Sequence, residues 1–177
     1  MIILTLQFLR DYFLNSITSL ERGFVAIDYT QDGIYFDGEP SGDKRLLNFD
    51  SSYGNHFYIR VNGEMDIIES YYRSNIRTFV HSLPIRLVAM VSNKNLKSDY
   101  VYGLFMNALE FPLPNNQFNI YFEPKNANLD KYLVFAEELK VQKPEDMPDL
   151  DLFSVIRIDG NLKFEGAFDP CFNPPCC

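Results

Sequence analysis

The sequence predicts a single α+β domain, in which a mainly antiparallel sheet carries an N-terminal helix and one or two further helices packed on it. Apolar residues recur at intervals of three and four near the N-terminus, which is typical of an amphipathic helix. Several later segments are rich in β-branched and aromatic residues and are bounded by turn dipeptides, which indicates strands. The 177 residues fit one domain, residues 1–168, followed by a Pro- and Cys-containing tail, residues 169–177.

The opening helix is expected over residues 4–20, because its apolar side chains form one stripe and polar residues fall away from it. Gly23 is expected to end this helix as a C-cap glycine. The stripe consists of Leu6, Leu9, Phe13, Ile17 and Leu20.

A first β-hairpin is expected from strands at residues 24–29 and 34–36, which an Asp-Gly turn at 32–33 joins. Residues 37–56 follow and contain four acidic residues, three Gly, three Ser and one Pro. This composition predicts a long exposed loop, and its length suggests an extended or partner-binding role.

A second hairpin is expected from strands at 57–61 and 65–70, with an Asn-Gly turn at 62–63. A longer strand is expected over residues 76–91, where Pro84 suggests an edge or a bulge. The side chains that share one face of this strand are Phe79, Leu83, Ile85, Leu87, Ala89 and Val91.

Two further helices are expected, over residues 98–111 and 129–140, the second capped by Asn128. Residues 118–122 between them read as a short strand, and residues 143–151 read as an acidic loop.

The last element has the clearest pattern, a strict alternation over residues 154–165 that predicts a long strand with one buried and one solvent-exposed face. The apolar face carries Ile156, Ile158, Leu162 and Phe164. The polar face carries Arg157, Asp159, Asn161, Lys163 and Glu165.

The formal net charge is −8, and the basic residues are scattered along the chain. Tight binding of nucleic acid or of an anionic membrane needs a concentrated basic surface, so neither is expected. The apolar start lacks the basic region and cleavage site of a signal peptide, and no segment is long and apolar enough to cross a bilayer. We therefore expect a protein that is made and kept in a cytoplasm.

No catalytic residues, cofactor or metal centre are expected, and the protein is predicted not to be an enzyme. Phosphate-binding glycine motifs and the GxSxG nucleophile elbow do not occur in the sequence. The only histidines are His56 and His81, and His81 is expected to be packed within a strand rather than to be a ligand. The acidic pairs that could do acid–base chemistry fall on loops and solvated helix faces.

All three cysteines lie in the tail, at Cys171, Cys176 and Cys177, so they form no disulfide framework for the body. A zinc site could be drawn from them and one histidine. Adjacent cysteines rarely hold one ion, so the tail is expected to be a flexible or partner-bound extension. A lipid anchor on the two terminal cysteines is a minor alternative.

Three places are candidates for contacts with other proteins. The pair Tyr71 and Tyr72 precedes an arginine, and such tyrosines are common in interfaces, although packing in the core or at a sheet edge accounts for most such tyrosines. The polar face of the last strand and the aromatic residue of the tail complete the set. The remaining candidate interface residues are Arg157, Asp159, Lys163 and Phe172.

The order of elements resembles that of the tail-terminator and head-to-tail connector ring proteins of tailed bacteriophages. Three parts carry the resemblance: the opening helix at 6–20, the strand through 83–88 that leads into the helix at 98–111, and the closing strand at 153–165. It covers most of residues 1–165 as a pattern. The segment 37–56, the helix at 129–140 and the cysteine tail make this chain longer than the compact members.

The resemblance implies a structural virion protein that forms a homo-oligomeric ring in the neck or tail. Its partners would then be further copies of itself and neighbouring neck or tail proteins, while DNA passes through the ring without being tightly bound. The alternative is a small cytoplasmic ligand- or peptide-binding or regulatory module without catalytic activity. The mass of the protein in solution separates the two, because a ring protein self-associates and a binding module stays monomeric.

Overall fold

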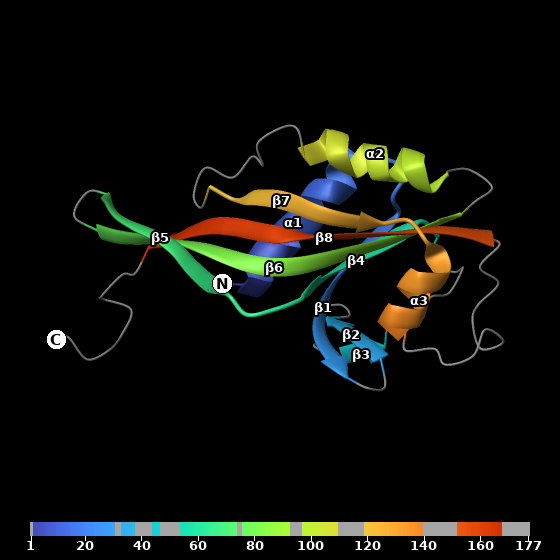
Figure 1. Ribbon diagram of the computed structural model, residues 1–177, viewed down its shortest axis with the longest axis horizontal. Coiled ribbons are helices and arrows are strands. Elements are labelled where there is room, and N and C mark those ends of the chain that lie inside the picture. Colours follow the sequence, from blue (N-terminus) through green and yellow to red (C-terminus); the bar gives the residue numbers. More distant parts are fainter. Residues whose placement is uncertain are drawn as a thin grey trace.

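The computed structural model describes residues 2–30, 33–37, 44–46, 54–73, 76–92, 97–109, 119–139 and 152–167 (Figure 1). Its helices are α1 (Ile2–Ser16), α2 (Ser98–Leu109) and α3 (Lys131–Leu139). Its strands are β1 (Arg22–Thr30), β2 (Gly33–Asp37), β3 (Lys44–Leu46), β4 (His56–Val61), β5 (Asp66–Arg73), β6 (Ile76–Ser92), β7 (Tyr121–Asn128) and β8 (Phe153–Ala167).

The predicted α+β fold is confirmed, because within the described residues a mostly antiparallel sheet carries the three helices. The strands follow the order β3-β2-β1-β4-β6-β8-β7, and β5 also pairs with β6. The pairing of β1 with β4 is parallel, and every other pairing is antiparallel. The expected hairpin of β1 and β2 is present.

Strand β6 is the central strand of this sheet, because β4, β5 and β8 all pair with it. Along one edge it pairs with β8 from Thr78 to Ser92. Along its other edge it pairs first with β5 and then with β4, which lie end to end. The predicted hairpin at 62–63 is therefore wrong, since β4 and β5 both pair with β6 and not with each other. Because β6 has 17 residues, its edge is long enough for two shorter strands.

Pro84 lies in this central strand, opposite the junction between β4 and β5. Its carbonyl accepts a hydrogen bond from the backbone N–H of Asn62 at 2.8 Å. In an antiparallel ladder the N and O of one residue point to the same neighbouring strand. The N–H that proline lacks would thus point to the junction between β4 and β5. No strand residue at the junction needs that N–H as a donor, so the proline breaks no hydrogen bond of the sheet.

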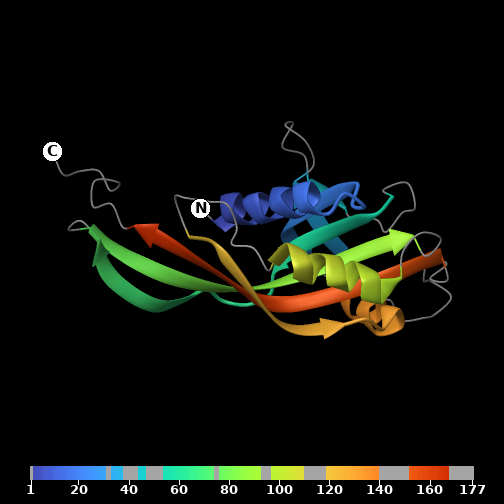
Figure 2. The ribbon, with the colours of Figure 1, turned by 90° about the horizontal axis from the view of Figure 1, so that it is seen from above.

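Helices α1 and α2 cover one face of the sheet, and the main core lies beneath them (Figure 2). The predicted stripe of α1 is buried throughout. At the centre, Phe13 of α1 meets Phe57 of β4 and Phe105 of α2 edge to face, with ring centroids 6.0 and 5.0 Å away. Edge-to-face aromatic pairs add to the free energy gained by apolar burial. They join both helices to the sheet.

The opening helix ends earlier than expected, at Ser16, and the chain turns before β1 begins. Gly23 is not its C-cap but lies inside β1. A Cβ atom on Gly23 would lie 2.7 Å from the ring of Phe57 and 2.8 Å from Cγ of Arg10. Glycine is thus needed here for close packing and not for a left-handed turn.

Two other predicted elements have different bounds in the structure. The segment 37–56 contains β3, which pairs with β2, and its last residue begins β4, so the part of it that the structure describes is not all loop. Strand β7 starts at Tyr121 and runs to Asn128 as an edge strand of the sheet. Residues 143–151 and 169–177 lie outside the described residues.

Helix α3 begins later than expected, and its cap is Asp130 rather than Asn128. The Asp130 carboxylate accepts hydrogen bonds from the backbone N–H groups of Tyr132 and Leu133 at 3.0 and 3.2 Å. Asn128 instead accepts one from the N–H of Asp130. Satisfying the first unpaired N–H groups of a helix is what an N-cap residue does.

Candidate subunit interface

Beyond the helices the sheet continues as an arm, which consists of β5, residues 76–82 of β6 and residues 163–167 of β8. Figure 2 shows this end of the sheet extending past the start of α1. In the arm, β6 lies between β5 and β8. At the base of the arm Phe164 is buried in the main core, whereas β5 lies beyond the described helices (Figure 2).

The arm exposes large apolar side chains to solvent. The exposed fractions are 60% for Ile67, 51% for Ile68, 74% for Tyr72 and 48% for Ile76. Every other residue of β5 is also exposed except Tyr71, which is half-buried. Apolar surface in water is unfavourable by roughly 25 cal/mol per Å², so covering these side chains with another chain would be favourable.

A β-bulge at Ile68 sets the direction of the β5 side chains. Ile67 pairs with His81 and Glu69 pairs with Val80, so Ile68 has no direct partner on β6. Side chains of paired residues share a face of the sheet. Ile67, Ser70 and Tyr72 therefore lie on the face that also holds α1, whereas Glu69 and Tyr71 lie on the opposite face.

Tyr71 is held within the arm by Glu165 of β8. The tyrosine hydroxyl donates a hydrogen bond to the Glu165 carboxylate, which raises the pKa of Tyr71 and lowers that of Glu165. The amide of Asn119 also donates to Glu165 at 2.8 Å. These bonds tie the two outer strands of the arm together across β6.

His81, as expected, is packed within its strand. Its ring stacks on Phe164 at 5.3 Å. Burial lowers the pKa of His81, so the ring is neutral at pH 7. A neutral ring stacked on an aromatic side chain adds apolar packing to the base of the arm.

On the face opposite α1, α3 is attached to the sheet through the buried carboxylate of Glu138, whose residue is 2% exposed. Arg60 donates to it twice, at 3.0 and 3.1 Å, and the Tyr58 hydroxyl donates at 2.6 Å. Arg86 donates to it at 2.5 Å. Burial alone would raise the pKa of Glu138, but the donors Arg60 and Tyr58 hold it below its usual value.

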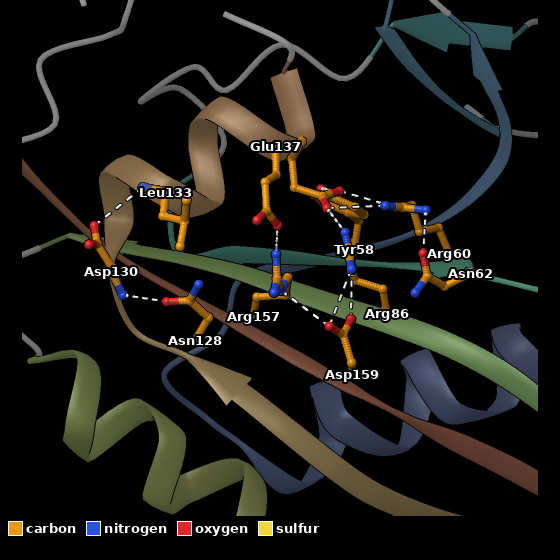
Figure 3. A network of polar contacts seen from close by, with 11 residues as sticks. Tyr58, Arg60, Asn62, Arg86, Asn128, Asp130, Leu133, Glu137, Arg157 and Asp159 are labelled. Atoms are coloured by element: carbon orange, nitrogen blue, oxygen red, sulfur yellow. Dashed lines mark hydrogen bonds and ion pairs between the residues drawn. The ribbon is translucent and has the colours of Figure 1, made fainter.

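The network continues across the sheet through Asp159 (Figure 3). Arg86 forms a bidentate pair with Asp159, at 2.6 and 3.2 Å. Arg157 lies 3.3 Å from the same carboxylate and also pairs with Glu137 of α3. Burial tends to lower the pKa of Arg86, but its two carboxylate partners raise it overall. Three guanidinium groups are thus balanced by three carboxylates.

Bidentate pairs fix orientation as well as charge. Below the helix, Val134 and the sheet residues Val88, Met90 and Val155 are buried. The network and this small apolar cluster hold α3 against the sheet. We interpret the network as structural, because every charge in it has an opposite charge as a partner.

The candidate interface residues lie in three different environments. The polar face of β8 was expected to be exposed, but α3 covers it at Arg157 and Asp159, whose side chains are 14% and 20% exposed. Lys163 pairs with Glu123 of the neighbouring strand β7 at 2.9 Å. Tyr71 and Tyr72 lie on opposite faces of the arm, and only Tyr72 is fully exposed.

The expected partner role of the two tyrosines stays a prediction, and the same arm carries three exposed apolar residues that are not among the predicted interface residues. These are Ile67, Ile68 and Ile76. Adjacent pairs such as Ile67-Ile68 and Tyr71-Tyr72 put apolar side chains on both faces of one strand, a signal of either complete burial or contact with a partner. Phe172 and the three cysteines lie outside the described residues.

No protein-family model matches this sequence, and a search of curated proteins finds no significant match. Within the described ranges, no group of three or more His, Cys, Asp or Glu side chains is arranged to hold a metal ion. None of the helices in that part of the chain has the length and apolar character needed to cross a membrane.

Proposed function

We propose that this protein is a structural assembly protein whose copies associate through the arm. One observation carries the proposal: β5 exposes Ile67, Ile68 and Tyr72 on a strand that no described helix covers. No residue of β5 belongs to the main core of the described part of the chain, which the α1 stripe and the Phe cluster close. Contact with another protein removes this surface from water.

The assembly that we propose is a ring in the neck or tail of a tailed bacteriophage, with DNA passing through it. The resemblance in element order supports this role, and the formal net charge of −8 suits a channel that DNA crosses without being held. In this proposal the protein acts in the virion and carries out no chemistry.

Size-exclusion chromatography with light scattering tests the association. We expect the wild-type protein to exceed the mass of one chain and the Tyr72→Asp variant to have a lower mass, with an unchanged far-UV circular dichroism spectrum that shows an intact fold. Tyr100→Asp is the matched control, because Tyr100 on α2 is also exposed, at 59%, but lies away from the arm. A wild-type protein of single-chain mass, or equal effects of the two variants, would contradict the proposal.

The placement in a phage neck is tested by the genes that flank the coding gene. A portal or tail gene beside it supports the placement. A flanking region without any phage structural gene counts against the placement but leaves the association through the arm intact.

A further inference from the structure

We infer that the partner of β5 is the β5 strand of a second copy, paired antiparallel across a two-fold axis at Ser70. This inference rests on the proposed function, because it names the partner of the arm. Within the described residues β5 pairs only with β6, so its other edge is available. An open edge strand is a template for pairing with another chain.

The register of such a pair follows from the faces of the β5 side chains. Paired residues in an antiparallel ladder lie on the same face of the sheet. Asp66 and Arg73 pair with Ser82 and Ile76 of β6, and thus both lie on the face opposite α1. Ile67 and Tyr72 both lie on the other face. Ile68 has no partner in the pairing with β6. If it also has none in the pairing with a second β5, the two residues of every pair between the copies lie on the same face of the sheet.

This alignment makes the strand complementary to itself. Asp66 of one copy faces Arg73 of the other, and the two-fold axis repeats this ion pair at the far end. Ile67 faces Tyr72 in the same way, which covers two of the most exposed apolar side chains of the arm. Ser70 faces its own copy at the axis, where a small side chain is needed because two identical groups meet.

The charge pattern also favours this alignment over parallel pairing in register. The acidic residues of β5, Asp66 and Glu69, lie in its first half, and Arg73 lies at its end. An in-register parallel pair would place each of these charges beside its own copy, which is unfavourable. The antiparallel pair places opposite charges together at both ends.

A two-fold contact joins two subunits and does not close a ring. A ring needs a second contact elsewhere on the surface. The exposed side chains of Leu129, Tyr132 and Leu133 at the start of α3 offer one, at the other end of the molecule from the arm (Figure 1). Pairs joined through that second contact would form a double ring.

Reciprocal charge reversal tests the pairing in the full-length protein. We expect Asp66→Arg and Arg73→Asp each to weaken self-association about tenfold or more, since each variant puts like charges together twice. An equal mixture of the two variants restores association, because in a mixed pair the introduced arginine of one copy faces the introduced aspartate of the other, and the native Arg73 faces the native Asp66. The double variant D66R/R73D restores it as well. Both residues are exposed, so each variant should keep the far-UV circular dichroism spectrum of the wild type.

A cross-link tests the position of the axis. In a chain whose Cys171, Cys176 and Cys177 are replaced by serine, Ser70→Cys should form a disulfide-linked dimer under mild oxidation. Cα atoms of directly paired residues are roughly 4.5–5.5 Å apart, within the range that a disulfide spans. Ser16→Cys, exposed at the end of α1, gives the background from random collision.

The outcomes separate the two proposals. Rescue by mixing, together with cross-linking of Ser70→Cys above the background, supports the two-fold pair. Association that depends on Tyr72 but shows neither rescue nor cross-linking would overturn the two-fold pair and leave the proposed function standing. A protein that stays monomeric up to its solubility limit would overturn both.

Discussion

The buried carboxylate of Glu138 gives the sharpest test of how α3 is held. Replacing it by glutamine keeps the shape of the side chain and removes its charge. The guanidinium groups of Arg60 and Arg86 then lose their shared anion inside the protein, where their side chains are only 10% and 15% exposed. Tyr58 and one arginine N–H can still donate to the amide oxygen, so the main loss is electrostatic.

The magnitude follows from the geometry of the network. Removing one partner of a buried ion pair costs about 3–5 kcal/mol, because the remaining charge is left uncompensated. Asp159 still neutralises Arg86 in the variant, through its bidentate pair. We therefore expect Glu138→Gln to lower the free energy of unfolding by about 3 kcal/mol. In a domain of this size that loss lowers the melting temperature by about 6–12 °C.

Urea unfolding followed by circular dichroism measures the loss, and the neighbouring glutamate is the control. Glu137 has a side chain that is 41% exposed, and its partner Arg157 keeps Asp159. Glu137→Gln should cost less than about 1 kcal/mol. If the two variants lose the same free energy, or if Glu138→Gln loses less than its control, the network does not hold α3 to the sheet.

Three further predictions concern pH, the sheet and the core. The folded-state pKa of Glu138 is lowered, so its contribution to stability is complete above the ordinary glutamate pKa of about 4.3 and is lost as pH falls through the lowered value. In acid titrations of the melting temperature, wild-type stability should therefore drop more steeply below about pH 5 than that of Glu138→Gln. Gly160→Ala should lower the free energy of unfolding by about 1–3 kcal/mol in urea unfolding, since its Cβ would lie 2.4 Å from the backbone oxygen of Glu123. An unchanged urea midpoint would show that β7 can move away from β8 without loss of stability. Phe13→Ala should cost about 3–5 kcal/mol by the same assay, whereas Tyr100→Ala, at an exposed position away from the arm, should stay within about 0.5 kcal/mol.

Much of the fold could be predicted from the sequence where a local period decides it. The stripe of α1 and the apolar face of β8 are buried as expected. Side chains repeat every 3.6 residues in a helix and every two in a strand, so a short window of sequence shows which of them share a face. The type of an element and its buried side follow from that window alone.

Pairing over long distances could not be predicted in this way. The Asn-Gly pair at 62–63 has the local signal of a hairpin turn, yet β4 and β5 lie end to end on β6. Whether β4 and β5 pair with each other or with β6 depends on the free energy of pairing with β6, which comes later in the chain. Gly23 is a similar case, since its environment is set by Phe57 and Arg10 and not by its sequence neighbours.

The candidate interface residues show the same division between what a local pattern predicts and what distant elements decide. The alternation in β8 identified Arg157 and Asp159 as polar positions of one face, and the sequence by itself determined that much. Only the tertiary structure decided that α3 brings two carboxylates onto this face and makes it internal. Conversely, Tyr72 is a candidate interface residue from the sequence, but Ile67 has the pattern of an ordinary strand residue, and only the extension of the sheet past its helices leaves it exposed. Alternation shows which side chains share a face, but whether that face meets a helix, solvent or a second chain depends on elements far away in the sequence.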